Sequence, residues 1–226
     1  MDMDLEELRG KSFIKELVRG KSGRGKTYAI SRAAIDLSKE GLDVMYADTE
    51  SEGAMTLLKL VETGGYKEGD IRNIHYEQTW SYEDVMGVLS TSNQKRYDVI
   101  VLDTLDHKHT YAINSYVEEA SDTRSDVDWS EWTAIHDLEK QMMEKISKPK
   151  TNIIATIDPD SGKMEKPKGV QTNVHGYFNL VVDMMKNGDD DWSHIVRNYV
   201  CGERYIGKTT PNVVDLLKKE IVKRTV

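Results

Sequence analysis

Short apolar runs and longer stretches with helical spacing follow one another along the chain. The clearest apolar run is Tyr97–Asp103, which lacks polar alternation and is therefore typical of a strand covered on both faces. Asn152–Ile157 has the same character. From Lys26 to about Glu40, small and branched apolar residues recur every three or four positions, and Gly41 follows as a helix-ending residue. The pattern indicates strands separated by helices.

The remaining predicted elements continue this order. The further predicted strands are Phe13–Val18, Val44–Ala47, Ile71–Tyr76, Leu180–Met185 and Ser193–Val200. The further predicted helices are Ala54–Val61, Ser81–Ser92, Trp129–Ile146 and Val213–Val222. His107–Asp128 is polar and shows neither the apolar spacing of a helix nor that of a strand, so residues 105–128 are a candidate insertion. Asn187-Gly188 predicts a turn between the last two strands.

This order of elements predicts the fold class. Alternating strands and helices followed by a late pair of strands indicate an α/β protein. We expect a mostly parallel central sheet flanked by helices, with a C-terminal antiparallel hairpin. A chain of 226 residues suits one domain, with a core over about residues 12–210 and a terminal helix within residues 211–226.

Composition excludes several classes of protein. Hydrophobic residues make up 38% and charged residues 31%, as in globular proteins. No apolar run approaches the roughly 20 residues that span a bilayer, so we expect no membrane partner. Met1–Arg9 lacks the apolar centre of a secretory signal, and Cys201 is the single cysteine, so we expect a reducing, cytoplasmic location. The six histidines are scattered without metal-ligand spacing, which argues against a zinc site.

Gly20–Thr27 matches the phosphate-binding pattern G-x-x-x-x-G-K-[ST] in full, between a predicted strand and a predicted helix. Glycines let consecutive backbone N–H groups curve around a phosphate, and the start of a helix adds partial positive charge. The expected nucleotide-binding residues are Gly20, Ser22, Gly23, Arg24, Gly25, Lys26 and Thr27. We expect Lys26 to bind the β- and γ-phosphates of ATP as a catalytic residue, and the Thr27 hydroxyl to bind Mg²⁺.

Asp103 stands at the end of the clearest apolar strand. A carboxylate at that position, in a protein with a phosphate-binding loop, holds Mg²⁺ and its water shell. We therefore expect Asp103 to be a metal ligand and a catalytic residue. The alternative is an ordinary aspartate in a turn after the strand.

Positive charge gathers in the predicted loop Asp158–Asn173, although the formal net charge of the chain is −8. Lys163, Lys166 and Lys168 fall within six residues. Such a patch suits the backbone of single-stranded DNA, whereas the overall charge argues against coating duplex DNA. These lysines are candidate DNA contacts, and the alternative is a surface segment without a ligand.

The order of these motifs resembles the RecA-like ATPases of phages and archaeal viruses that are often called phage nucleotide-binding proteins. Some of these are single-strand-annealing recombinases. The resemblance covers roughly residues 12–210, and the matching segments are Gly20–Thr27, Met45–Glu50, Tyr97–Thr104, Asp128–Ile146, Asn152–Ile157 and the late hairpin. It implies a RecA-like P-loop NTPase fold, Mg²⁺-dependent ATP hydrolysis, a single-stranded DNA partner and a homo-oligomeric ring or filament.

The resemblance also implies roles for residues that follow two strands. Glu50, at the end of the strand expected beside the phosphate-loop strand, is the implied base that orients the attacking water. Asp48 is the competing candidate and Glu52 the next, and a solvated acidic turn is the alternative. Thr156 and Asp158 end another strand, where such proteins hold a γ-phosphate sensor, and an ordinary strand end is the alternative.

Basic residues on or after the late hairpin are candidates for a finger that reaches the nucleotide of a neighbouring subunit. They are Lys186, Arg197, Arg204 and Lys208.

The chain departs from the resemblance in places. Lys15 and Glu16 interrupt the first strand, and the sensor position lacks the glutamine of bacterial RecA. Lys21 makes the phosphate loop similar to that of ParA-like partition ATPases, although Ser22 replaces a glycine. The leading hypothesis is an ATPase that handles single-stranded DNA in annealing or recombination. The alternatives are a partition or packaging ATPase and a regulatory nucleotide-binding protein with little turnover.

Overall fold

One eight-stranded sheet organises the chain, in the order β3-β2-β4-β5-β1-β6-β7-β8. The computed structural model describes residues 13–119, 131–148, 150–159, 174–187, 191–197, 209–210 and 221. The strands are β1 (Lys15–Arg19), β2 (Val44–Asp48), β3 (Ile74–Gln78), β4 (Val99–Asp103), β5 (Asn152–Ile157), β6 (Leu180–Asn187), β7 (Asp191–Arg197) and β8 (Thr209–Thr210). All pairings from β3 to β6 are parallel, whereas β6–β7 and β7–β8 are antiparallel. The predicted parallel sheet with a late antiparallel hairpin is confirmed.

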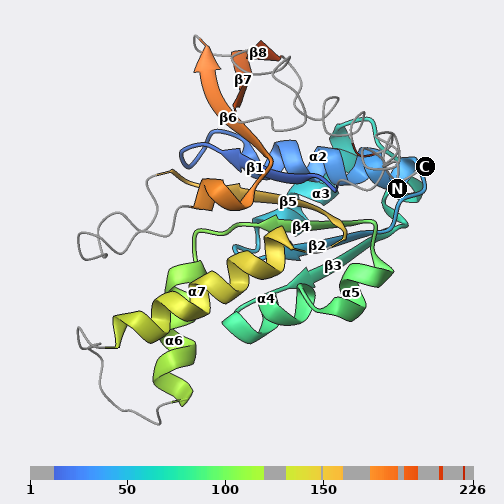
Figure 1. Ribbon diagram of the computed structural model, residues 1–226. Helices are drawn as coiled ribbons and strands as arrows, with labels where there is room; N and C mark the ends of the chain where they lie inside the picture. The colour runs from blue at the N-terminus through green and yellow to red at the C-terminus, as the bar shows by residue number, and fades with distance from the viewer. Residues whose placement is uncertain are drawn as a thin grey trace, which may run out of the picture.

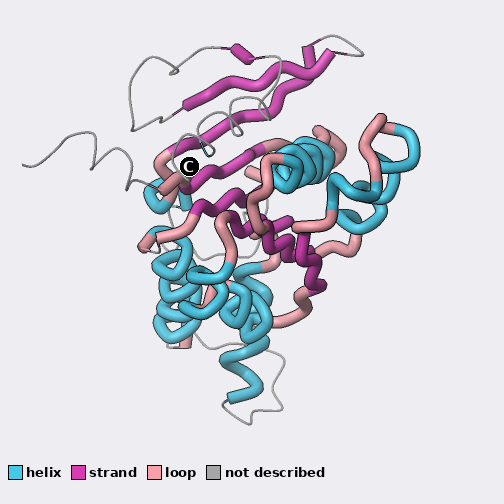
Figure 2. The backbone as a smooth tube through the Cα atoms, turned by 90° about the vertical axis from the view of Figure 1, so that its right-hand side faces the viewer, coloured by secondary structure: helices cyan, strands magenta, loops and turns pink. Residues whose placement is uncertain are grey.

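Helices cover both faces of the sheet (Figures 1 and 2). They are α2 (Lys26–Lys39), α3 (Glu52–Thr63), α4 (Tyr82–Val88), α5 (Thr91–Arg96), α6 (Lys108–Glu119) and α7 (Trp132–Ser147), with 3-10 helices η1 (Glu68–Ile71) and η2 (Val174–Tyr177). α2 and α3 lie on one face, and α4 to α7 lie on the other (Figure 1). No helix in the described ranges combines the length and the apolar composition needed to cross a membrane.

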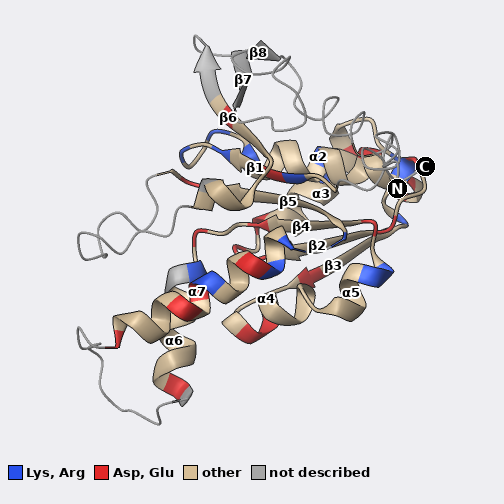
Figure 3. Cartoon of the chain, in the orientation of Figure 1, with Lys and Arg blue, Asp and Glu red and all other residues tan. Residues whose placement is uncertain are grey.

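Alternate residues of the central strands enter two separate apolar cores. Val44 and Val99 pack on the α2 side, whereas Met45, Ile100 and Ile153 pack on the α4 and α7 side. Side chains of a strand alternate between its faces, so a strand with both faces buried must be apolar at nearly every position. Figure 3 shows the result, since the central strands β4 and β5 are mostly uncharged and the charges lie on helices and at strand ends.

β1 is the exception, because it buries two side chains that can carry charge, Lys15 and Glu16. Lys15 donates from Nζ to the backbone carbonyl of Thr151, and burial lowers the pKa of its ammonium to about 7. Glu16 is completely buried, and neither carboxylate oxygen has a hydrogen-bond partner among the described residues. Burial raises the pKa of Glu16 well above its ordinary value. The strand forms despite these residues because its backbone is paired on both sides, with β5 and β6.

Several predicted elements differ in their bounds from the observed ones, and two of these differences have a local cause. The helix predicted over Ser81–Ser92 is two helices, because Ser90 interrupts it and caps α5 by accepting a hydrogen bond from the Asn93 amide. The strand predicted over Ile71–Tyr76 begins only at Ile74, because η1 ends at Ile71 and a turn follows at Arg72 and Asn73. Both differences arise from local hydrogen bonding that apolar periodicity does not report.

α6 occupies part of the segment that showed no period. It contacts α4 and α7, and Ser115 donates a 2.7 Å hydrogen bond to Glu83 on α4. The buried residues of α6 combine apolar Ala112 with polar Lys108 and Ser115, so the helix lacks the continuous apolar stripe expected of a surface helix. Residues 120–128 of the candidate insertion lie outside the described residues, as does most of the predicted helix Val213–Val222, of which Ile221 is helical and buried.

The lateral position of β2 corrects one expectation. β2 pairs with β3 and β4, and two strands, β4 and β5, separate it from β1. The expectation that Glu50 follows a strand beside the phosphate-loop strand is therefore wrong. The order of strands along the chain does not determine their order across a parallel sheet, because each crossover connection can skip positions.

Candidate functional site

The carboxyl ends of the parallel strands meet at one edge, and the Gly20–Thr27 loop lies there between β1 and α2. The Gly20 amide donates to the Ile157 carbonyl at the end of β5, over 3.2 Å. Gly23 and Gly25 have φ angles of 73° and 78°, in the left-handed region that favours glycine. α2 begins at Lys26, so its first amides face this edge. The loop therefore has the strand–loop–helix setting that the motif requires.

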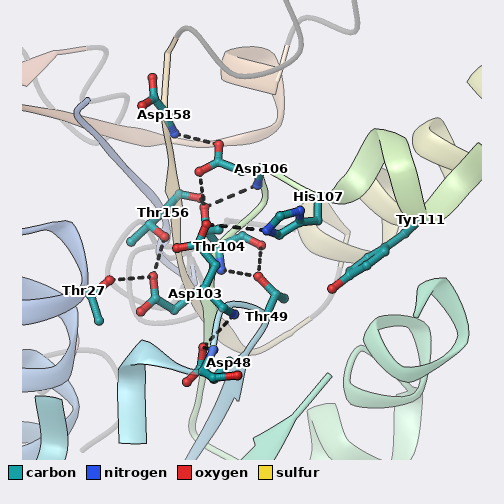
Figure 4. Close-up of polar contacts among 12 residues, drawn as sticks. Thr27, Asp48, Thr49, Asp103, Thr104, Asp106, His107, Tyr111, Thr156 and Asp158 are labelled. Atoms are coloured by element: carbon teal, nitrogen blue, oxygen red, sulfur yellow. Dashed lines mark hydrogen bonds and ion pairs between the residues drawn. The ribbon is translucent and has the colours of Figure 1, made fainter. Parts of the chain in front are cut away.

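Asp103 lies at the centre of a cluster of hydroxyl groups (Figure 4). Its Oδ1 accepts hydrogen bonds from Thr156 (2.8 Å) and from Thr27 of the phosphate loop (3.4 Å). Its Oδ2 accepts one from the Tyr46 hydroxyl, at 3.0 Å. Burial raises the pKa of Asp103 to about 6, and hydrogen bonds from Thr156, Tyr46 and Thr27 act in the opposite direction. The structure thus joins the two residues predicted as metal ligands.

The donor set of Thr27 and Asp103 fits Mg²⁺. Both are oxygen ligands, which Mg²⁺ prefers, and they come from the phosphate loop and a strand end. Asp103 is only 2% exposed, and burial is the largest influence on its pKa. A buried carboxylate in this setting gains from a bound cation. The metal itself remains a prediction.

Asp48 has a structural role at the end of β2. Its Oδ1 accepts hydrogen bonds from the amides of Glu50 and Ser51, both at 2.9 Å. Its Oδ2 accepts from the Gly53 amide at 2.8 Å and from the Tyr76 hydroxyl at 2.8 Å. The side chain is fully buried. With both oxygens used twice, Asp48 shapes the turn into α3, and this disfavours it as the base.

Glu50 offers a more accessible carboxylate. Its side chain is 38% exposed, and its Oε1 lies 3.5 Å from Nε2 of His107. Burial raises the pKa of Glu50 most, Asp106 raises it further, and His107 and Lys26 lower it. Glu52 is exposed in the first turn of α3.

Thr49 and Thr104 join the ends of β2 and β4. The Thr49 amide donates to the Asp103 carbonyl at 2.7 Å. The Thr104 amide donates to Thr49 Oγ1 at 2.8 Å, and that hydroxyl donates to the Thr104 carbonyl at 3.1 Å (Figure 4). The Asp103–Thr104 peptide bond is cis. The hydrogen bonds of Thr49 hold the backbone before Glu50 against the backbone after Asp103.

The two sensor candidates are both bonded within the site. The Thr156 hydroxyl donates to Asp103, as described above. Asp158 accepts a 2.9 Å hydrogen bond from the Ser22 amide, and its own amide donates to Asp106 Oδ1 at 2.8 Å. These contacts connect the end of β5 to the phosphate loop and to the segment after β4. A sensor role for Thr156 or Asp158 stays a prediction.

Sequence reasoning missed Tyr46, Asp106 and His107 as parts of the site. Asp106 and His107 follow Asp103 by three and four positions, and this proximity was a usable signal. Tyr46 carried none, because a tyrosine inside an apolar run reads as an ordinary core residue.

Other predicted residues stay untested. Those outside the described residues are Lys163, Lys166, Lys168, Arg204 and Lys208. Lys186 and Arg197 lie on β6 and β7, where the structure describes only the backbone. The DNA-contact and finger hypotheses therefore rest on the sequence.

Comparisons with known proteins agree on the fold. A family model described as an AAA domain matches residues 12–209. The RadB recombinase structure superposes with a TM-score of 0.53 at 17% identity, covering 91% of this chain and 90% of that one. The flagellar accessory protein FlaH from Methanocaldococcus jannaschii gives 0.50 at 14% identity, covering 87% and 84%. A search of curated proteins found no match. At these identities the structural likeness shows the fold alone, and it confirms the predicted RecA-like architecture.

Proposed function

The chain belongs to the AAA domain family, and on this basis we propose that it binds and hydrolyses ATP with Mg²⁺. The observation that carries the proposal is the contact between Thr27 and Asp103, 76 positions apart, at 3.4 Å. A phosphate-loop hydroxyl beside a buried strand-end carboxylate is the arrangement that holds Mg²⁺ on the phosphates of a nucleotide.

The phosphate loop supplies the binding part of this function. The glycine-permitted turns of Gly23 and Gly25 and the first amides of α2 present N–H groups to the phosphates. Lys26 adds a positive charge for the β- and γ-phosphates. When bound, Mg²⁺ neutralises charge on the phosphates and helps to orient them.

Glu50 supplies the base in this proposal. Its carboxylate hydrogen-bonds to a water molecule, orients it for attack on the γ-phosphate and takes its proton, while the bond between the γ-phosphorus and the bridging oxygen breaks and ADP leaves. The raised pKa of Glu50 makes it a better proton acceptor than an ordinary surface glutamate. Asp48 positions Glu50 by accepting a hydrogen bond from its amide, while Thr49 holds the adjacent backbone to β4.

We further propose that ATP turnover is coupled to single-stranded DNA, bound by Lys163, Lys166 and Lys168, in a homo-oligomeric assembly. Asp158 supports this coupling because it begins the lysine-bearing segment and accepts a hydrogen bond from Ser22 of the phosphate loop. The two structural neighbours are a recombinase and a flagellar accessory protein, so the shared fold alone does not select DNA as the partner. A regulatory nucleotide-binding protein is the alternative.

The test measures ATP binding and turnover with and without single-stranded DNA, together with the mass in solution. We expect Mg²⁺-dependent turnover that DNA accelerates. Lys26→Ala should lose ATP binding while circular dichroism shows an unchanged fold, because Lys26 is not in the core. Unchanged ATP affinity in that variant would show that the phosphate site is misassigned. Binding without turnover in the wild type would favour the regulatory alternative.

A further inference from the structure

His107 contacts the candidate base directly. It precedes α6, and its Nε2 lies 3.5 Å from Oε1 of Glu50. The His107 side chain is 43% exposed, so both partners are reachable from solvent. This distance allows an ion pair when the imidazole is protonated, and a small movement would bring a neutral N–H donor into hydrogen-bond range.

The imidazole of His107 is itself held in place. Its ring lies 5.8 Å from the ring of Tyr111, centroid to centroid, and the two planes tilt by 32°. The Tyr111 amide donates to the His107 carbonyl at 2.9 Å, and the Tyr111 hydroxyl donates to the Thr79 carbonyl at 3.3 Å. Figure 4 shows His107 and Tyr111 side by side at the start of α6. The first turn of α6 and the end of β3 therefore determine where His107 lies.

Charged groups around Glu50 make its contact with His107 important for where the carboxylate lies. Asp106 and Glu52 repel its carboxylate, while Lys26 and His107 attract it. Lys26 is also the residue proposed to bind the phosphates of ATP. If Glu50 paired with Lys26, the base would leave the position of the attacking water and would compete with the phosphates. His107, which lies between β4 and α6, offers the carboxylate a second partner outside the phosphate loop.

We propose that His107 is a positioning residue for the hydrolysis reaction, which holds the Glu50 carboxylate in its working position and away from Lys26. The inference rests on the proposed ATPase function. It assigns a role to the segment between β4, which ends at Asp103, and α6.

The kinetic test compares His107→Ala with Glu50→Gln and with the double variant. We expect His107→Ala to lower kcat for ATP by roughly 10-fold to 100-fold, the scale of a misplaced catalytic group. His107→Gln should recover part of the loss, because its amide nitrogen can donate to Glu50. In the Glu50→Gln background, His107→Ala should change kcat little, since the carboxylate that it positions is gone. His136→Ala on α7 is the matched control and should match the wild type.

A second readout does not depend on turnover. The imidazole resonances of His107, followed by NMR, should move in Glu50→Gln and stay in place in the control Glu52→Gln. Unmoved resonances, an unchanged or raised kcat in His107→Ala, or an equal loss in both backgrounds would overturn the inference. If the wild type does not hydrolyse ATP, the proposed function fails, and the NMR comparison still decides whether His107 and Glu50 form a pair.

Discussion

The hydroxyl of Tyr46 lies 3.0 Å from Oδ2 of Asp103 and 2.9 Å from Oγ of Ser31. Tyr46 comes from the buried centre of β2, Asp103 from the end of β4 and Ser31 from α2. Tyr46 and Val44 face the same core, because they are two positions apart on one strand. A core tyrosine thus fixes one oxygen of the proposed metal ligand while the phosphate loop approaches the other.

Replacing Tyr46 with phenylalanine should weaken both the fold and the metal site. The change leaves Asp103 Oδ2 and Ser31 Oγ without this buried partner, and a hydrogen bond to a charged group contributes about 1.5–3 kcal/mol. We expect the free energy of unfolding to fall by about this amount in chemical denaturation. The Mg²⁺ concentration needed for half-maximal nucleotide binding should rise.

Tyr76→Phe is the matched control for this substitution. The Tyr76 hydroxyl bonds to Asp48, whose carboxylate keeps three backbone N–H donors in the variant. We expect a smaller loss of stability and an unchanged Mg²⁺ requirement. Equal Mg²⁺ requirements in Tyr46→Phe and the wild type would contradict the role of Tyr46.

Glu50→Gln should bind ATP and Mg²⁺ normally and hydrolyse ATP at least about 100-fold more slowly, since a general base contributes roughly 10²–10⁴-fold. Single-turnover hydrolysis and equilibrium binding separate the two effects. Wild-type turnover in this variant would remove Glu50 from the mechanism.

Asp48→Asn should behave differently from Glu50→Gln. Its amide cannot accept all four hydrogen bonds of the Asp48 carboxylate, so the turn into α3 loses support. We expect lower thermal stability as the first effect, measured by differential scanning fluorimetry. A variant with native stability and no hydrolysis would instead make Asp48 the base.

Glu16 predicts a pH dependence of stability. Burial raises its pKa in the folded state well above the unfolded value of about 4.3. The folded state therefore binds a proton that the unfolded state releases, and stability falls as the pH rises from about 4.3 toward the raised pKa. The free energy of unfolding of the wild type, minus that of Glu16→Gln, should fall between about pH 4.3 and the raised pKa of Glu16 and stay constant above it. Urea denaturation at a series of pH values measures the difference.

Glu16→Met extends the same test. It replaces a buried carboxyl that has no hydrogen-bond partner in the described part of the chain with an apolar side chain of similar length. An unsatisfied buried polar group costs about 1–3 kcal/mol. We expect a gain of that order at neutral pH. Because Lys15 is present in every variant, its own titration cancels in the comparison. A loss of stability in Glu16→Met would indicate that the Glu16 carboxyl has a partner.

Neutralising Lys163, Lys166 and Lys168 to alanine should weaken binding to single-stranded DNA. Each phosphate contact contributes about 0.7 to the slope of log affinity against log salt, so the slope should flatten by about 2. Fluorescence anisotropy at several salt concentrations measures it, and ATP binding should be unchanged. If the wild type binds no DNA at low salt, with or without ATP, the DNA-coupled proposal fails.

Local features of the sequence determined much of this protein. The Gly20–Thr27 loop could be predicted because a phosphate-binding turn depends on consecutive residues with particular backbone freedom. β4 and β5 could be predicted because burial of both faces demands an uninterrupted apolar run. Even the class of the fold followed, since parallel strands need helical crossovers between them.

The tertiary structure alone decided the relations between segments. It separated β2 from β1, made Asp48 a structural residue while leaving Glu50 accessible, and brought Tyr46, Thr156 and His107 to the site. Asp48 and Glu50 are two positions apart and chemically alike, so no local pattern distinguishes them. Their roles depend on which hydrogen-bond donors reach each carboxylate. Those donors come from strands and helices whose order across the sheet does not follow from their order along the chain.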